Sequence, residues 1–291
     1  MPEAKIGVIG GSGLYQVEGL SEVEEVYPDT PWGKPSDSIT IGTLEGQRMA
    51  FLPRHGRGHR FNPTDVPVRA NIYALKMLGV EWVIGVSAVG SLREGIAPLD
   101  LVIPDQIFDR TALRPRTFFG DNLGMVAHVT FANPFCETLR PVLYEATQQT
   151  EAKVHFGGTY VCMEGPLFST KAESNIYRKL GCDIIGMTAI PEAKLAREAE
   201  MHYGLIACAT DYDCWHESAK SVTVEMVVNN LLQNVGRAKQ ILQIVTPQVA
   251  ALSNNGKCDC DTALANAIMT DRSKIPPASV EKLGILVKKY F

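Results

Sequence analysis

The chain has 291 residues, of which 45% are hydrophobic and 21% charged, and its formal net charge is −4. These proportions are typical of a globular protein with a sizeable core, and the slightly acidic balance excludes a broad basic surface for nucleic acid or for an anionic membrane. No apolar run approaches the ~18 residues that span a bilayer, and the N-terminus lacks a signal-peptide pattern, so we expect a cytoplasmic protein.

Short apolar runs alternate with amphipathic segments along the chain. The apolar runs predict strands over residues 6–9, 38–43, 48–52, 82–86, 101–104, 159–163, 183–186 and 205–209. The amphipathic segments predict helices over residues 67–78, 134–150, 170–179, 191–203, 223–244 and 280–290. This alternation predicts a single α/β domain over residues 1–291, with a mixed, mostly parallel central sheet flanked by helices on both faces. Residues 248–291 are expected to form a C-terminal tail or arm.

Seven cysteines are scattered along the chain, and those within apolar runs are expected to be reduced core residues. Cys258 and Cys260 differ, because they lie in a polar segment where a redox or disulfide pair is possible. A zinc site would require two more ligands, and nothing nearby in the sequence supplies them. We therefore predict no metal.

Two glycine-containing loops follow predicted strands and have features of an anion site. In G10-G-S-G13 the third glycine of a dinucleotide-binding fingerprint is replaced by Gln16, but the backbone N–H groups of such a turn can hold phosphate. A tight structural turn explains that segment almost equally well. The loop at residues 53–59 contains Arg54 and His55 among glycines, so a guanidinium could fork onto phosphate there. The alternative is a basic surface loop.

Hydroxyl and acidic side chains follow the other strands. V86-S-A-V-G-S91 and G186-M-T-A-I190 carry hydroxyls, and A209-T-D-Y-D-C-W215 carries two aspartates. In an extended backbone Asp211 and Asp213 would point to the same side, and two acids in one pocket raise each other's pKa. Ligands of open α/β sheets bind at the carboxyl ends of strands. The sequence therefore predicts one pocket with an anion side and an acidic side, although a lone D-x-D more often marks a solvated turn.

These segments, in their order along the chain, resemble the motifs of a known family. They are G10-G-S-G-L-Y15, R54-H-G-R-G-H59, S87-A-V-G-S-L92, V161-C-M-E-G-P-L-F-S-T170, G186-M-T-A-I-P-E192 and A209-T-D-Y-D-C-W215. The family is the 5′-methylthioadenosine phosphorylases, of the trimeric branch of the purine nucleoside phosphorylase superfamily. The match covers roughly residues 5–248. One departure is Gly186, where some members carry asparagine.

The resemblance implies a purine nucleoside phosphorylase-like fold and a homo-oligomer, either a trimer or a dimer of trimers. It implies a nucleoside substrate with inorganic phosphate as co-substrate, no cofactor, and no nucleic acid or membrane partner. The residues implied to bind phosphate are Ser12, Arg54, His55, Ser87 and Thr188.

The resemblance also implies how the nucleoside is bound. The residues implied to contact it are Ala88, Phe168, Met187, Asp211, Asp213, Val224 and Val228. The ribose would rest on Met187 and Ala88, Phe168 would stack near the base, and the two valines would line the pocket of the methylthio group. His128 looks like the family histidine that reaches a neighbouring subunit's site near the 5′ end of the substrate.

The implied reaction is the reversible phosphorolysis of S-methyl-5′-thioadenosine to adenine and 5-methylthioribose 1-phosphate. Asp213 is expected to protonate N7 of the leaving base, and Asp211 to accept from the 6-amino group, although these roles could be reversed. The alternatives are a nucleosidase, which Met163-Glu164 resembles in part, a 6-oxopurine or methylthioinosine phosphorylase, and a non-catalytic purine sensor.

Overall fold

The computed structural model describes residues 3–11, 14, 17–216, 224–253 and 258–291, with only the backbone described at 224–228 and 231. The strands are β1 (Ile6–Gly10), β2 (Ser21–Val26), β3 (Ile39–Leu44), β4 (Gln47–Pro53), β5 (Trp82–Ser91), β6 (Leu101–Ile103), β7 (Gln106–Asp109), β8 (Val154–Phe156), β9 (Thr159–Cys162), β10 (Ile184–Gly186) and β11 (His202–Asp211). The α-helices are α1 (Val68–Met77), α2 (Leu139–Thr147), α3 (Lys171–Lys179), α4 (Ala189–Glu198), α5 (Val224–Ala250) and α6 (Pro277–Leu283).

The strands form one mixed sheet around β5. Its main path is β2-β3-β4-β1-β5-β10-β9-β7, and β11 pairs with both β5 and β6. In the described part of the chain, six of the ten strand pairings are parallel, which confirms the predicted mixed, mostly parallel sheet. Each strand of the series β4-β1-β5-β11 runs parallel to the next one, so the carboxyl ends of these four strands meet at the same edge of the sheet.

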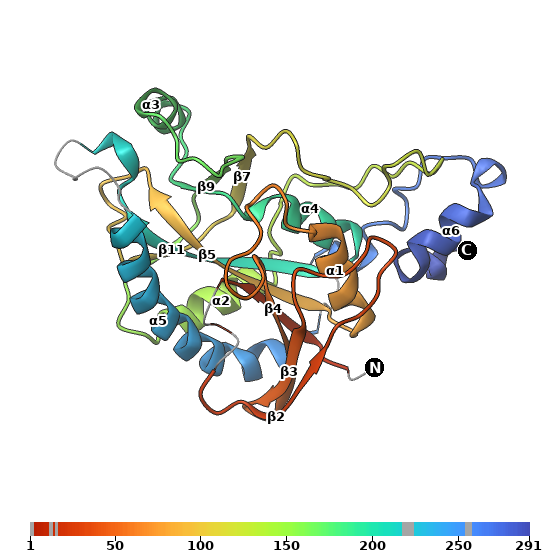
Figure 1. The fold of residues 1–291 in the computed structure, drawn as a ribbon, viewed down its shortest axis with the longest axis horizontal. Coiled ribbons are helices and arrows are strands. Elements are labelled where there is room, and N and C mark those ends of the chain that lie inside the picture. The colour runs from red at the N-terminus through yellow and green to blue at the C-terminus, as the bar shows by residue number, and fades with distance from the viewer. Residues whose placement is uncertain (1–2, 12–13, 15–16, 217–223, 254–257) are drawn as a thin grey trace.

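Helices cover both faces of the sheet, as predicted (Figure 1). On one face, Leu139 of α2 and Ile241 of α5 belong to a buried cluster with Ile6 of β1. On the other face, Ile72 of α1 and Leu195 of α4 belong to a second buried cluster. The rigid sheet between these clusters positions the loops at its edge.

Several boundaries differ from the prediction for local reasons. The helix predicted at 191–203 ends at Glu198, because Glu200 has a positive φ of 53° and β11 begins at His202. The last predicted helix is divided at Gly284, which has a φ of 50°. The strands β2, β7 and β8 were not predicted, since β2 is rich in exposed glutamates and neither β7 nor β8 contains a buried residue that would give an apolar run.

The C-terminal segment packs onto the rest of the chain. Leu283, Leu286 and Val287 are buried in the same cluster as Ile72 of α1. Glu200, two residues before β11, accepts from the Tyr290 hydroxyl and pairs with the Lys289 ammonium at 2.6 Å. Among the described helices, none combines the length and the hydropathy needed to cross a bilayer.

Candidate active site

A cavity of about 920 Å³ opens at the carboxyl ends of β5, β10 and β11. Its polar lining comes from the ends of these strands and from the loop after β4, while Leu232, Val235 and Ala238 of α5 form an apolar wall. The volume is in the range of pockets that enclose a small organic ligand. The position agrees with the rule that open α/β sheets bind ligands beyond their carboxyl ends.

The structure brings most of the predicted site residues together. Those lining the cavity are Arg54, His55, Ser87, Ala88, Phe168, Met187, Thr188, Asp211 and Asp213. Ser12 lies outside the described residues, and so do the side chains of Val224 and Val228. His128 is exposed and is not among the lining residues.

The two aspartates share the cavity, but not through the alternation of an extended strand. Asp211 ends β11, whereas Asp213 begins a 3₁₀ turn with a positive φ of 52°. The turn directs the Asp213 N–H toward Asp211 Oδ1, at 2.7 Å. A Cβ at Gly90 would lie only 3.1 Å from Asp211 Oδ1 and 3.3 Å from Asp213 Cβ, so glycine at that position of β5 makes room for the pair.

Burial raises the pKa of both carboxyls. For Asp211, the Thr210 hydroxyl and the Asp213 N–H partly oppose this effect, and the negative charge of Asp213 adds to it. For Asp213, hydrogen bonds from Ser174, from the Cys214 backbone and from Ser169 oppose burial. Desolvation is therefore the main cause at both carboxyls, and the repulsion between the carboxylates that the sequence led us to expect adds to it at Asp211.

Arg54 is buried on the opposite side of the cavity, and Glu192 takes the forked contact that we expected phosphate to take. Glu192 Oε1 accepts from the Arg54 Nε–H, and Oε2 accepts from Nη2 at 3.1 Å. Backbone oxygens of Val86 and Ile9 accept from Nη1 and Nη2 at 2.9 and 3.1 Å. A guanidinium has five N–H groups, so within the described part of the chain these four contacts leave one Nη1–H for a ligand. Burial disfavours the charged form of Arg54, but the attraction of the Glu192 carboxylate is stronger than this effect. The pKa of Arg54 is therefore raised.

His55 contributes a neutral ring beside this cation. Burial and the nearby Arg54 charge lower the pKa of His55 to about 4. Its Nδ1 lies 2.9 Å from the Phe61 carbonyl oxygen, which requires the hydrogen on Nδ1. Near neutral pH, His55 is therefore uncharged, and the positive charges on this side of the cavity are those of arginines such as Arg54 and Arg60.

The hydroxyls of Ser87 and Thr188 contact each other in the lining of the cavity. Their oxygens are 2.7 Å apart, and the Thr188 N–H donates to the Tyr160 hydroxyl at 3.3 Å. Tyr160 packs against Gly186, where an added Cβ would approach the Tyr160 hydroxyl oxygen to 2.1 Å. The departure from the family pattern at Gly186 thus has a physical cause, because a side chain there would displace Tyr160.

Sequence reasoning assigned no role to several residues that support the site. Glu192 stood inside a quoted motif, yet its partner Arg54 is 138 residues away. Ser174 comes from α3 and donates to Asp213 Oδ2. Asn234 of α5 lines the cavity, and its buried Oδ1 has no hydrogen-bond partner within the described residues. Only the helical period of α5 could have indicated which of its side chains face the sheet.

Glu164, part of the fragment that resembles a nucleosidase, is not among the lining residues. It accepts from the backbone N–H groups of Ala112 and Leu113 at 2.5 and 3.1 Å, and from the Arg114 Nε–H at 3.1 Å. Burial acts to raise its pKa, but these hydrogen bonds and one from Thr64 lower it to about 2. Glu164 therefore organises the 112–114 loop as a carboxylate.

Comparisons with known proteins agree with this geometry. A sequence profile of the phosphorylase superfamily matches residues 5–246. The chain is 55% identical over 289 residues to the S-methyl-5′-thioadenosine phosphorylase of Geobacter sulfurreducens, covering 99% of each. It is 55% identical over 292 residues to the protein of the same name from Chloroflexus aurantiacus, covering 100% of each.

Solved structures resemble the whole chain. A methylthioadenosine phosphorylase sourced from an antarctic soil metagenomic library superimposes with a TM-score of 0.92 at 46% identity, covering 98% of this chain and 99% of the other. The methylthioadenosine phosphorylase of Schistosoma mansoni in complex with adenine gives a TM-score of 0.84 at 36% identity, covering 91% of this chain and 99% of the other.

Proposed function

The chain belongs to the phosphorylase superfamily, and we propose that it catalyses the reversible phosphorolysis of S-methyl-5′-thioadenosine to adenine and 5-methylthioribose 1-phosphate. The observation that carries this proposal is the two-sided cavity, with Arg54 on one side and the Asp211–Asp213 pair on the other. Phosphorolysis needs such polarity, because an anion must attack the sugar while the leaving base gains a proton.

Phosphate would lie on the Arg54 side of the cavity. The remaining Nη1–H of Arg54 and the hydroxyls of Ser87 and Thr188 offer donors, and Gly11, directly after β1, lines the same cavity. The role of Ser12 in binding phosphate stays a prediction, because Ser12 lies outside the described residues. The neutral His55 ring adds a polar group without a second charge. An anion held there would stabilise the oxocarbenium-like sugar as the bond to the base breaks. Phosphate is the co-substrate, and this chemistry requires no cofactor.

The aspartate pair would receive the purine. Asp213 takes three donors, from Ser169, Ser174 and the Cys214 backbone, which favours its charged form. Asp211 accepts only two hydrogen bonds, and the negative charge of Asp213 further raises its pKa. We therefore assign the proton for N7 to Asp211 and the acceptor for the 6-amino group to Asp213, the reverse of the roles expected from the sequence.

The sugar would lie between these two sides. Met187 and Ala88 offer the surface for the ribose, and Phe168, half exposed at 54%, offers a face for the base. The apolar wall formed by Leu232, Val235 and Ala238 of α5 suits a methylthio group better than a hydroxyl. The contact of Val224 and Val228 with this group stays a prediction, because their side chains lie outside the described residues.

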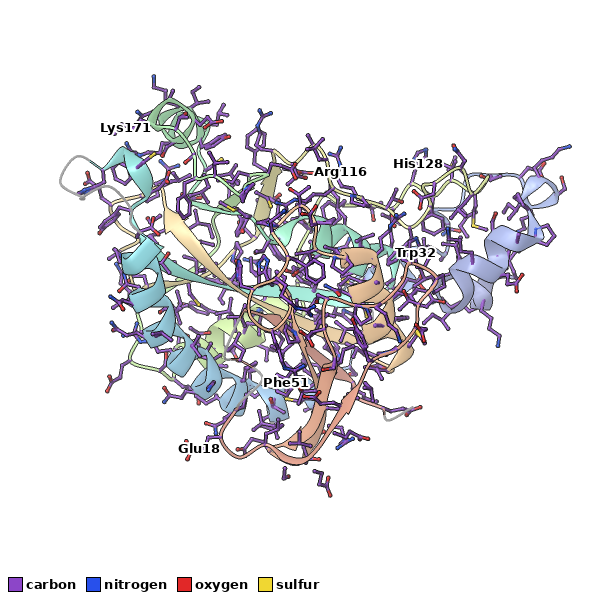
Figure 2. All side chains as sticks on the ribbon, in the orientation of Figure 1. Glu18, Trp32, Phe51, Arg116, His128 and Lys171 are labelled. Carbon is purple, nitrogen blue, oxygen red and sulfur yellow. The ribbon has the colours of Figure 1, made fainter. Side chains whose placement is uncertain are left out.

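We further propose that the enzyme is a homo-oligomer in which His128 serves a neighbouring subunit. His128 lies on the extended segment between β7 and α2, on the side where α6 packs, and its N–H donates to the Ala267 carbonyl oxygen at 2.8 Å (Figure 2). Its exposure and its absence from its own chain's cavity lining support this assignment. A trimer or a dimer of trimers would supply the neighbour.

The test is incubation of the purified protein with methylthioadenosine, with and without phosphate, followed by chromatography of adenine and the sugar phosphate. Phosphate-dependent release of adenine is expected, with little turnover of methylthioinosine. Release of adenine without phosphate would instead make the protein a nucleosidase, and preference for methylthioinosine would contradict the role of the aspartates in selecting adenine.

A further inference from the structure

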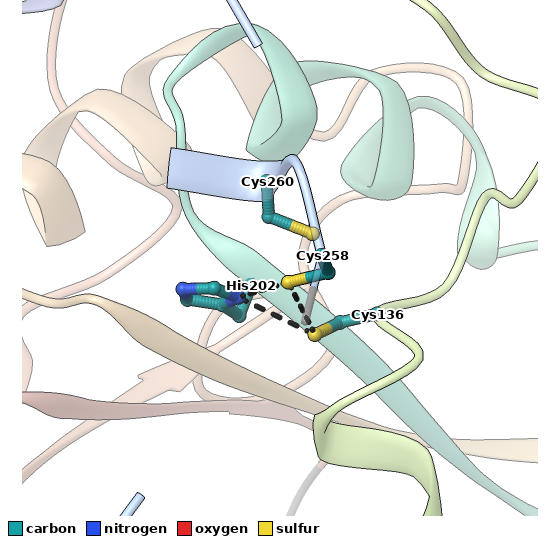
Figure 3. A group of neighbouring side chains, drawn as sticks. All are labelled: Cys136, His202, Cys258 and Cys260. Atoms are coloured by element: carbon teal, nitrogen blue, oxygen red, sulfur yellow. Dashed lines mark hydrogen bonds between the residues drawn. The ribbon is translucent and has the colours of Figure 1, made fainter. Parts of the chain in front are cut away.

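Three cysteines and a histidine converge at the end of β11 opposite the cavity (Figure 3). The ligand atoms of Cys136, His202, Cys258 and Cys260 all lie within 4.8 Å of one another. His202 Nδ1 is 3.3 Å from Cys136 Sγ and 3.3 Å from Cys258 Sγ, and these two sulfurs are 3.6 Å apart. Three of the four residues are buried and Cys258 is partly buried.

These separations agree with the edges of a zinc tetrahedron. Zinc bonds of about 2.3 Å to sulfur and 2.0–2.1 Å to nitrogen give sulfur–sulfur edges of about 3.8 Å and sulfur–nitrogen edges of about 3.5 Å. The three distances among Cys136, His202 and Cys258 are within a few tenths of an ångström of these edges, and the Cys260 sulfur lies within 4.8 Å of each of the other ligand atoms. The distance of 3.6 Å between the Cys136 and Cys258 sulfurs is well beyond the ~2.05 Å of a disulfide.

We propose that Cys136, His202, Cys258 and Cys260 bind one Zn²⁺ ion as a structural Cys₃His site. Four protein ligands close the coordination shell, which is typical of structural and not of catalytic zinc. Thiolates with one imidazole select zinc over magnesium or calcium, which prefer oxygen. Binding would release the protons of the three thiols, leaving a site with a net charge of −1.

The surroundings orient these ligands. The His202 ring stacks on Trp82, with centroids 3.9 Å apart and planes 14° apart, so its Nδ1 is held toward the sulfurs. The Leu139 N–H, at the start of α2, donates to Cys136 Sγ at 3.4 Å. Such contacts beyond the ligands fix their direction and stabilise the thiolate.

The ion would tie three distant parts of the chain together. Cys136 precedes α2, His202 begins β11, and Cys258 lies 122 residues after Cys136. The nine steps along β11 from His202 to Asp211 span about 30 Å, which keeps the metal away from the proposed substrate. The expected role is therefore to fix the C-terminal segment against the sheet.

The first test is metal content. Untagged protein, purified anaerobically without chelator, should contain one equivalent of zinc per chain by plasma mass spectrometry. Cys260→Ser and Cys136→Ser should each lose most of this zinc. The matched control is Cys182→Ala, because Cys182 is a buried cysteine outside the cluster, and it should keep its zinc.

A second measurement does not depend on how the variants fold. Reduced wild-type apoprotein, titrated with Co²⁺, should give the visible absorption and the thiolate charge-transfer bands of a tetrahedral site, and Zn²⁺ should abolish them. Removing zinc should lower Tm by several degrees without changing kcat at 25 °C.

Three results would overturn the proposal. They are substoichiometric zinc together with no cobalt spectrum, a Cys258–Cys260 disulfide in protein alkylated before unfolding, or a fall in kcat on metal removal with Tm unchanged.

Discussion

Arg54 and Glu192 form a buried ion pair beside the cavity, with side-chain exposures of only 4% and 2%. The carboxylate accepts from two guanidinium nitrogens, and the Tyr203 hydroxyl donates to its Oε2 at 3.0 Å. Glu192 thereby holds the guanidinium in one orientation, and one Nη1–H has no partner among the described residues. Under the proposed function, phosphate binding and folding stability would therefore depend on the same pair.

Glu192→Ala should destabilise the protein by about 3–5 kcal/mol, because it leaves the Arg54 charge buried without its partner. Urea unfolding followed by fluorescence measures this loss. Glu192→Gln is the control, since its amide oxygen can still accept from Arg54, and it should cost less. If the alanine variant were within about 1 kcal/mol of wild type, the pair would not have the structural importance assigned to it.

Asp211→Asn should lower kcat for methylthioadenosine by about 10²–10⁴-fold, the range for loss of a general acid, with little change in the KM for phosphate. The reason is that asparagine cannot deliver a proton to N7. Steady-state kinetics with each substrate varied in turn separate the two constants. An unchanged kcat would remove Asp211 from this role, and the same loss found only at Asp213 would restore the assignment expected from the sequence.

Asp213→Asn should instead alter base selection. An asparagine amide can donate to a 6-oxo group, whereas a carboxylate repels it, so turnover of methylthioinosine should rise relative to methylthioadenosine. The ratio of the two kcat/KM values is the measurement. Ser174→Ala is a milder control, because it removes one donor to Asp213 and leaves the carboxylate in place. A ratio that stays at the wild-type value would contradict the selecting role.

The sequence predicted which strand ends form the cavity, because small polar residues after apolar runs are a local signal. It did not predict the contacts within the cavity. The guanidinium of Arg54 pairs with a residue 138 positions away in the sequence. The two aspartates come together because the backbone of Asp213 adopts a positive φ, which the pattern of an extended strand does not indicate. Pairings between distant segments depend on how the sheet folds, and that information is not contained in any short segment.

Glu198 makes the stability of the folded state depend on pH. Its side chain is buried, with Oε2 accepting from the Phe118 N–H at 2.6 Å. Burial raises its pKa to about 7, against an ordinary value of 4.5, so the folded state holds a proton that the unfolded state releases between these values. The stability that the folded state gains by keeping this carboxyl protonated is therefore fully present below about pH 4.5 and is lost as the pH rises through 7.

Glu198→Gln should accordingly stabilise the protein by up to about 3 kcal/mol at pH 8.5 and have little effect at pH 4.5, because glutamine keeps the acceptor and never ionises. Urea unfolding of both proteins at the two pH values gives the difference. Comparing variant with wild type also cancels His55, whose lowered pKa of about 4 acts in the opposite direction between pH 4 and 6.5. Glu281→Gln, at an exposed position, should show no such pH dependence. Equal effects of Glu198→Gln at both pH values would contradict the assignment.

His128 can be tested by complementation between subunits. His128→Ala and Asp211→Asn should each impair the enzyme alone, and size-exclusion chromatography with light scattering should show an oligomer for both. If each site takes Asp211 from one chain and His128 from its neighbour, random mixing by co-expression should leave about a quarter of the sites intact.

The mixed oligomers should therefore recover about a quarter of wild-type activity per site, far above either parent variant. A chain carrying both substitutions, co-expressed with the Asp211→Asn chain, is the control, because no combination of these two chains rebuilds an intact site. Recovery is expected only when the two substitutions are on separate chains, since only then can the His128 of one chain complete a site whose Asp211 belongs to the other. An active monomer, or mixed oligomers no more active than their parents, would place His128 outside the neighbouring site.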